Sequence, residues 1–190
     1  MYLDRMIFPI ETLGPGQRLV IWTAGCTKHC KGCANPELWE TRGRRQRSTG
    51  EIAGMIRRIA AEHHIDGITI SGGDPLEQAP QLLELLDEIA GLTEDILVYT
   101  GFTYDELDSV LTAEELAHLR SRVGVLIDGR YVEDLNTPDT ALRGSSNQDI
   151  IFFKDELRER YEQHMAQGRR IQNVYMGSRL ISVGIHDREQ

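Results

Sequence analysis

The feature that most limits the folds open to this chain of 190 residues is a repeated order of strand, loop and amphipathic helix. Residues 18–23, 67–71, 96–99 and 124–127 form short apolar runs rich in β-branched side chains, which is typical of buried strands. Apolar residues at helical spacing follow the first three of these runs. Because strands that alternate with helices pair in parallel through right-handed crossovers, this order predicts an α/β fold.

Three of the expected helices begin with a recognisable capping motif. A Ser or Thr followed three residues later by Glu is the pattern of a capping box, found at Ser48 and Glu51, Thr103 and Glu106, and Thr112 and Glu115.

The later part of the chain adds a strand at 149–153 and a hairpin of 171–176 and 180–183. These units are too few for a closed eight-stranded barrel. We expect a partial, open β/α barrel with a C-terminal hairpin, as one domain over 1–190 with its core at about 14–153 and an extension at 154–190.

All three cysteines, Cys26, Cys30 and Cys33, fall within eight positions directly after the first strand. Thiolates are soft ligands that suit zinc or an iron-sulfur cluster. Three thiolates would leave one iron of a four-iron cluster open to another molecule. A Cys3His zinc site with His29 is the alternative, although the adjacent side chains of His29 and Cys30 converge poorly on one tetrahedral ion. A disulfide framework is the weaker alternative, because the cysteine count is odd.

Composition excludes several classes of partner. The net charge of −9 argues against nucleic acid as the main partner, because phosphate binding needs a basic face. The basic run at 42–47 predicts a solvated loop, with contact to an anionic ligand or an acidic surface as the alternative.

The sequence also predicts where the protein is found. No run of 18 apolar residues is present, so we expect no membrane span. The first residues lack the pattern of a signal peptide, and we therefore expect a cytoplasmic protein.

A second glycine-rich loop, Gly72-Gly73-Asp74, follows the second strand. Two glycines let the backbone approach a ligand closely, since no Cβ intrudes and positive φ angles are accessible. The Asp74 carboxylate could accept charge-assisted hydrogen bonds from a ligand ammonium. The simpler alternative is a tight turn with Asp74 at a helix start. The carboxyl ends of parallel strands meet at one rim, so we expect this loop beside the cysteines.

Seven segments in order, which begin at Gly14 and end at Gln148, together resemble the radical S-adenosylmethionine (SAM) activating enzymes, and more narrowly the activators of anaerobic ribonucleoside-triphosphate reductase. The segments are Gly14-Pro15-Gly16, Gly25-Cys26 with its C-x3-C-x-Gly-C loop, Asn35-Pro36, Ser71 to Leu76, Tyr99 to Thr103, Leu126 to Tyr131 and Arg143 to Gln148. The chain departs from the wider superfamily in two places. Gly32 stands where many members carry an aromatic residue, and Asp74 where many carry Glu.

The resemblance implies roles for particular residues and a fold of the radical SAM type. Cys26, Cys30 and Cys33 would hold a [4Fe-4S] cluster, whose open iron takes the amino and carboxylate groups of SAM. Residues implied to contact SAM are Gly32, Cys33 and Ala34, then Gly72, Gly73 and Asp74 at its methionine ammonium, and Tyr99, Thr100, Gly101 and Asp128 at the next strand ends. Arg143 is implied without a role: it could pair with a carboxylate or brace its loop.

The activity implied by the resemblance is that of an activase. The reduced cluster would cleave SAM to methionine and a 5'-deoxyadenosyl radical, which would take a hydrogen atom from one glycine of the anaerobic reductase. A flavodoxin-like or other low-potential donor would supply the electron, and no side chain need act as acid or base. Three alternatives stay open at this point: a radical SAM enzyme with a different target, a zinc-stabilised binding module, and simple electron carriage.

Overall fold

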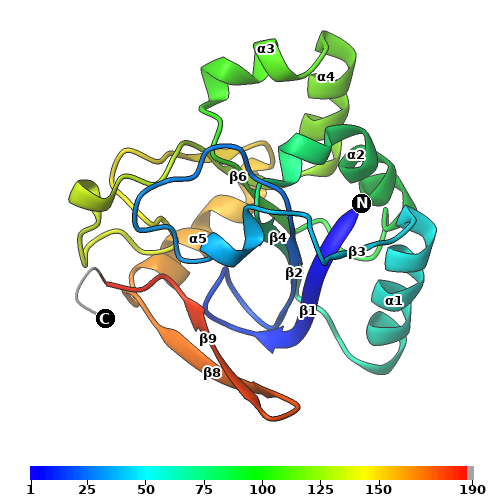
Figure 1. The fold of residues 1–190 in the computed structure, drawn as a ribbon, viewed down its shortest axis with the longest axis horizontal. Coiled ribbons are helices and arrows are strands. Elements are labelled where there is room, and N and C mark those ends of the chain that lie inside the picture. Colours follow the sequence, from blue (N-terminus) through cyan, green and yellow to red (C-terminus); the bar gives the residue numbers. More distant parts are fainter. Residues whose placement is uncertain (188–190) are drawn as a thin grey trace.

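The fold is built on one twisted sheet. A computed structural model describes residues 1–187, so the last three residues of the predicted domain 1–190 lie outside the described residues. Within that range the chain forms a seven-stranded sheet in the order β3-β1-β2-β4-β5-β6-β7 (Figure 1). Its strands are β1 (Tyr2–Ile10), β2 (Arg18–Thr23), β3 (Arg45–Gln46), β4 (Gly67–Gly72), β5 (Ile96–Tyr99), β6 (Val125–Ile127) and β7 (Ile150–Phe152).

The four central strands pair as the sequence predicts. β2, β4, β5 and β6 are parallel neighbours, whereas β1, β3 and β7 are each antiparallel to the strand beside them. The sheet ends at β3 on one side and β7 on the other, so it does not close into a barrel. The expectation of an open α/β sheet is therefore confirmed. Parallel pairing does not extend to β7, because the connection from β6 contains only the 3-10 turn Glu133–Leu135 and no α-helix that could form a crossover.

The predicted helices are present with their caps. They are α1 (Thr49–Glu62), α2 (Ala79–Glu88), α3 (Leu107–Val110) and α4 (Ala113–Arg122). Ser48, Thr103 and Thr112 each form a capping box with the glutamate three residues later. α2 packs against both α1 and α4, so the three longer helices make one layer on the sheet.

Each parallel strand sends alternate side chains to opposite faces of the sheet, as the two-residue period of a strand requires. In β2, Leu19 and Ile21 join the large apolar core beneath the helices. Val20 and Trp22 join a smaller cluster on the other face, which also contains Val183 of the C-terminal hairpin. That second face is only partly covered, and the site described below lies on it.

Three elements were not predicted. The nine-residue strand β1 was missed because Asp4 and Arg5 interrupt its apolar pattern; in the structure these two side chains form an ion pair. The helix α5 (Arg158–Met165) was missed because its sequence is strongly charged, yet it buries Tyr161 completely. The run 42–47, predicted to be a solvated loop, instead includes the short exposed strand β3. The division into a core and an extension stays a prediction.

The C-terminal hairpin is confirmed and slightly longer than predicted. Its strands are β8 (Ile171–Met176) and β9 (Arg179–Gly184), which pair antiparallel as a separate two-stranded sheet. Figure 1 shows it in orange and red, extending away from the central sheet. Among residues 1–187, no helix is long and apolar enough to cross a membrane.

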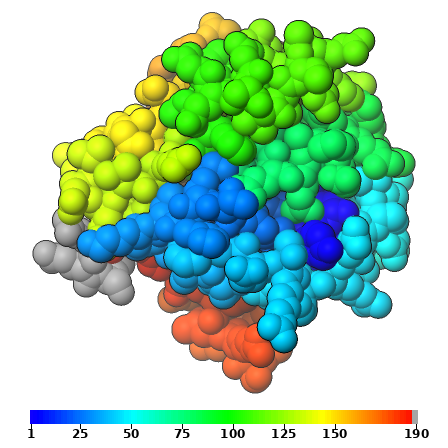
Figure 2. Space-filling view, turned by 45° about the horizontal axis from the view of Figure 1, so that its top comes forward, coloured from blue at the N-terminus to red at the C-terminus, as the bar shows by residue number. Residues whose placement is uncertain are grey.

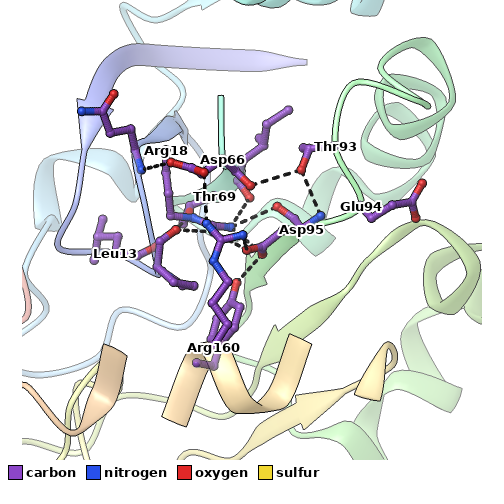
Figure 3. Close-up of polar contacts among 12 residues, drawn as sticks. Leu13, Arg18, Asp66, Thr69, Thr93, Glu94, Asp95 and Arg160 are labelled. Atoms are coloured by element: carbon purple, nitrogen blue, oxygen red, sulfur yellow. Dashed lines mark hydrogen bonds and ion pairs between the residues drawn. The ribbon is translucent and has the colours of Figure 1, made fainter. Parts of the chain in front are cut away.

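A buried ionic network fastens the sheet at the end opposite the cysteine loop (Figure 3). The fully buried Arg18, at the start of β2, donates to both carboxylate oxygens of Asp95 at 2.8 and 3.0 Å. Its Nε donates to Thr69 Oγ1 at 2.7 Å, and Tyr161 donates its hydroxyl proton to Asp95 at 2.7 Å. The remaining guanidinium protons reach the carbonyl oxygens of Pro15, Ile68 and Asp95. The network thus joins β2, β4, the start of β5 and α5.

We predict that Arg18→Met lowers the free energy of unfolding by about 3–5 kcal/mol, because it removes the buried guanidinium that pairs with the carboxylate of Asp95. Urea unfolding followed by circular dichroism measures this change. Arg57→Met is the control, since the exposed Arg57–Glu88 pair should contribute only about 0–1 kcal/mol. Equal losses of unfolding free energy in the two variants would show that the buried network stabilises the fold no more than an exposed ion pair does.

Candidate functional site

The cysteine loop leaves the C-terminal end of β2, and the chain that follows it holds its base. The Gly25 N–H donates to the carbonyl of Leu38 at 2.8 Å, and the Cys26 N–H donates to the carbonyl of Trp39 at 2.9 Å. Leu38 is fully buried in a short 3-10 turn, Pro36–Leu38. This turn therefore packs back on the base of the cysteine loop.

Inside the loop, two residues with positive φ reverse the chain. His29 has φ 45° and Gly32 has φ 74°. A Cβ on Gly32 would collide with the carboxylate of Glu133 and come tightly against the ring of Tyr131. Gly32 therefore lets the cysteine loop lie directly against the segment that follows β6. In Figure 2 the loop, in mid-blue, is at the surface next to that yellow-green segment.

The three thiols lie on one cavity. Cys26, Cys30 and Cys33 are free and half-buried, and all three line a cavity of about 560 Å³. Burial raises the pKa of the Cys26 thiol, and a hydrogen bond with the backbone of Lys28 acts in the opposite direction. A positive metal centre is what would hold this sulfur as a thiolate.

The donor set suits a cluster better than a single zinc ion. His29, the candidate fourth ligand of a zinc site, stacks on Trp39 with ring centroids 4.7 Å apart. Over the part of the chain that the structure describes, no three His, Cys, Asp or Glu side chains are grouped closely enough to hold one metal ion. The ligands of a [4Fe-4S] cluster need not converge on one ion, because each cysteine binds a different iron atom. Three half-buried thiols on one cavity fit that requirement.

The glycine-rich loop lies directly beside the cysteine loop, as predicted. The Gly73 N–H donates to Thr23 O and the Asp74 N–H donates to Gly25 O, both at 2.8 Å, so the β2–β4 pairing continues beyond the strands. A Cβ on Gly72 would collide with the backbone of Thr23, and one on Gly73 with the backbone of Gly25. The two glycines are therefore required by the close approach of the two loops.

Asp74 is the most heavily bonded side chain of the site. Its carboxylate is 1% exposed and accepts hydrogen bonds from Leu76 N, Thr100 Oγ1 and Gly101 N at 3.0, 2.9 and 2.9 Å. The ammonium of Lys28 lies 2.6 Å from its Oδ2. The structure thus confirms that Asp74 caps a short 3-10 turn, and the ammonium that it binds there belongs to Lys28; contact with a ligand ammonium stays a prediction.

Sequence reasoning missed two charged residues here. Glu77 accepts hydrogen bonds from the backbone N–H and the hydroxyl of Thr27 at 2.8 and 2.7 Å, and from Lys28 at 3.1 Å. Burial acts to raise the pKa of Glu77, but the hydrogen bonds from Thr27 and Lys28 outweigh it and the pKa is lowered. The one available signal was the spacing of Asp74 and Glu77, which puts two carboxylates on one short turn next to the cysteines.

The other residues predicted at the strand ends divide into two groups. Gly32, Ala34, Tyr99, Thr100 and Gly101 line the cavity. Asp128 does not line it: its carboxylate accepts hydrogen bonds from Tyr104 N at 2.6 Å and Asp149 N at 2.9 Å, which braces the ends of β6 and β7.

Tyr99 and Arg143 hold the loop that ends at Gln148. The Tyr99 hydroxyl donates to Leu142 O at 2.9 Å, and burial raises the pKa of Tyr99 far above its usual value. Arg143 donates to the carbonyl of Gln148 at 2.9 Å, so it braces this loop. The Gln148 side chain bridges Gly129 and Gly144 across the cavity wall. Residues 181–187 of β9 and its exit form a further wall that the sequence did not predict.

We predict that Gly72→Ala lowers the free energy of unfolding by about 1–3 kcal/mol, since its new Cβ would separate the two loops. Iron retained after anaerobic reconstitution should fall with it. Gly54→Ala is the matched control, because Gly54 lies in α1 with open space around its Cβ position and alanine favours a helix. Unchanged stability and iron content in Gly72→Ala would mean that the loops need not touch.

Comparison with known proteins shows the family to which the chain belongs. A family model described as a 4Fe-4S single cluster domain matches residues 12–151. The anaerobic ribonucleoside-triphosphate reductase-activating protein of Escherichia coli K12 is 34% identical over 148 residues, which are 74% of this chain and 92% of that protein. Proteins of the same name from Vibrio cholerae and from Enterobacteria phage T4 are 34% and 30% identical over 155 residues, and 95% and 92% of their lengths are covered.

The matched region 12–151 contains both loops, all three cysteines and every strand of the parallel core. This chain belongs to the 4Fe-4S single-cluster family that includes the anaerobic ribonucleoside-triphosphate reductase-activating proteins.

Proposed function

We propose that this chain is a radical SAM activase, which binds a [4Fe-4S] cluster and SAM and generates a glycyl radical on an anaerobic ribonucleoside-triphosphate reductase. The observation that carries the proposal is the shared cavity, where three thiols lie beside a Gly-Gly-Asp loop whose carboxylate already binds an ammonium group. The names of the relatives support the choice of target. The open sheet is then a partial barrel of the radical SAM type.

Cys26, Cys30 and Cys33 are the cluster ligands in this proposal. When bound and reduced by a low-potential electron donor, the cluster would supply the electron for reductive cleavage of SAM to methionine and a 5'-deoxyadenosyl radical. Three protein ligands suit this chemistry better than electron carriage, because a closed cluster needs a fourth cysteine and the chain has none.

SAM occupies the cavity beside the thiols in this proposal. Asp74 accepts hydrogen bonds from its α-amino group, and Gly72 and Gly73 allow the backbone to approach its methionine portion. Gly32 to Ala34 contact the nucleoside, and Tyr99, Thr100 and Gly101 form the wall opposite. The chain's own residues bind, orient and enclose the reactants, while no side chain transfers a proton.

The partner contributes one glycine in this proposal. Its Cα–H bond breaks, the hydrogen atom passes to the 5'-carbon of the deoxyadenosyl radical, and the unpaired electron remains on the glycine. The glycine would approach the cavity, which is lined both by the cysteine loop and by residues of β9 and its exit. A cytoplasmic location fits such a partner.

We predict that anaerobic reconstitution loads about four iron and four sulfide per chain, the content of one [4Fe-4S] cluster. Cys30→Ala should lose most of this iron, because one ligand is removed. His29→Ala should keep it, since His29 stacks on Trp39 and is no ligand in this proposal. One equivalent of zinc that depends on His29 would contradict the cluster.

We predict that the dithionite-reduced protein converts SAM to 5'-deoxyadenosine, measured by chromatography. Asp74→Asn should weaken SAM binding roughly 10- to 100-fold, because a charge-assisted hydrogen bond contributes about 1.5–3 kcal/mol. Product formation without a glycyl radical on the reductase would leave a radical SAM enzyme with another target. Intact SAM in a fully loaded, reduced protein would overturn the proposal.

A further inference from the structure

Lys28 occupies a place that the proposed function gives to a ligand. Its side chain is 4% exposed, and its Nζ lies 2.6 Å from Asp74 Oδ2 and 3.1 Å from Glu77 Oε1. The same ammonium lies over the ring of Phe102, 3.4 Å from the ring centroid. Lysine is rarely buried to this degree without partners of opposite charge, and here it has two carboxylates and an aromatic face.

The slot that holds Lys28 is shaped for it. Gly101 has no side chain, and a Cβ at that position would collide with Lys28 Cδ. The aliphatic stem of Lys28 therefore passes across the backbone of Gly101 toward Asp74. Because Gly101 also donates its N–H to Asp74, this one residue positions both the stem of Lys28 and the carboxylate of Asp74.

The Asp74 carboxylate has no free acceptor position. A carboxylate offers about four lone-pair sites, and four donors share them: Leu76 N, Thr100 Oγ1, Gly101 N and Lys28 Nζ. Three of these donors belong to the backbone or to a buried hydroxyl. Lys28 is the one on a flexible side chain, so an incoming amino group can reach Asp74 only by displacing it.

Glu77 gives the displaced ammonium somewhere to go. Its Oε1 is already within hydrogen-bond distance of Lys28, and its Oε2 accepts only from Thr27 N at 3.1 Å. The side chain of Glu77 is 17% exposed, which leaves room for adjustment. A small rotation of the Lys28 side chain would therefore exchange one carboxylate for the other without leaving a buried charge unpaired.

We propose that Lys28 is an internal competitor for the α-amino group of SAM: it holds Asp74 in the absence of SAM and moves to Glu77 when SAM binds. This inference rests on the proposed function, which assigns the SAM amino group to Asp74. Lys28 and Glu77 are then positioning residues that set the affinity for SAM. Since Lys28 lies between Cys26 and Cys30, the exchange takes place within the cysteine loop itself.

Equilibrium binding of SAM to the anaerobically reconstituted protein tests the exchange, with each variant compared at equal iron content. Lys28→Met keeps the apolar stem but frees Asp74, and should tighten SAM binding by about 3- to 10-fold. The reason is that every molecule then has Asp74 free to accept the amino group, whereas in the unaltered protein only a fraction does. Glu77→Gln removes the negative charge that would hold the displaced ammonium and should weaken binding by a similar factor. Lys154→Met, distant in sequence and paired with Glu94, is the charge-matched control and should bind as the unaltered protein does.

The two variants separate competition from a structural role by the sign of the change. A brace would weaken SAM binding whether Lys28 or Glu77 were altered, so weaker or unchanged binding in Lys28→Met overturns the proposal. In the double variant the effect of Glu77→Gln should disappear, because Glu77 acts through Lys28. Lys28→Gln serves as a second neutral variant if Lys28→Met fails to hold iron, with the same expected sign.

The failure of the exchange and the failure of the proposed function give different results. If the unaltered, cluster-loaded protein does not bind SAM at all, the proposed function falls and the exchange falls with it. If the unaltered protein binds SAM and Asp74→Asn weakens binding while Lys28→Met does not tighten it, the proposed function stands and only the exchange is wrong.

Discussion

The site depends on the close approach of two backbones at the end of the parallel sheet. The hydrogen bonds from Gly73 to Thr23 and from Asp74 to Gly25 continue the β2–β4 ladder past the last strand residues. No side chain larger than hydrogen fits at Gly72 or Gly73. This contact brings the cysteine loop and the Asp74 carboxylate, 41 to 48 residues apart in sequence, to the same cavity. The chemistry proposed here follows from that contact, because neither loop alone offers both a metal site and an amino-group acceptor.

The two ends of the sheet have opposite characters. At one end Arg18, Asp95 and Tyr161 form a buried network in which every guanidinium donor has an acceptor, so that end is closed and rigid. At the other end the cysteines are half-buried and the cavity is open to the surface. The proposed function requires an open rim that admits SAM and a protein segment, and the buried network at the opposite end offsets the stability that such a rim lacks.

Local signals in the sequence predicted most of the framework. The capping boxes at Ser48, Thr103 and Thr112 and the apolar runs of the central strands were correct, since each depends on neighbours within a few residues. Strand β1 was missed because Asp4 and Arg5 interrupt its apolar pattern, and their further partners, Arg44 and the ring of Trp22, are distant in sequence.

The candidate site was predicted less completely than the framework. The cysteines and the Gly-Gly-Asp loop were placed together correctly, because the ends of parallel strands must meet. The burial of Lys28 between Asp74 and Glu77 could not be read from the sequence, since a lysine in a loop looks the same whether it is solvated or paired. The bracing role of Asp128 and the cavity wall from β9 also depend on long-range packing.

The most direct test of the central claim is to follow one hydrogen atom. The reductase partner is prepared with its glycines deuterated at Cα and mixed with the reduced, cluster-loaded protein and SAM without oxygen. The account predicts one deuterium in 5'-deoxyadenosine by mass spectrometry, together with a glycyl radical signal in the electron paramagnetic resonance spectrum of the reductase. Unlabelled 5'-deoxyadenosine with no such signal would contradict hydrogen abstraction from that glycine.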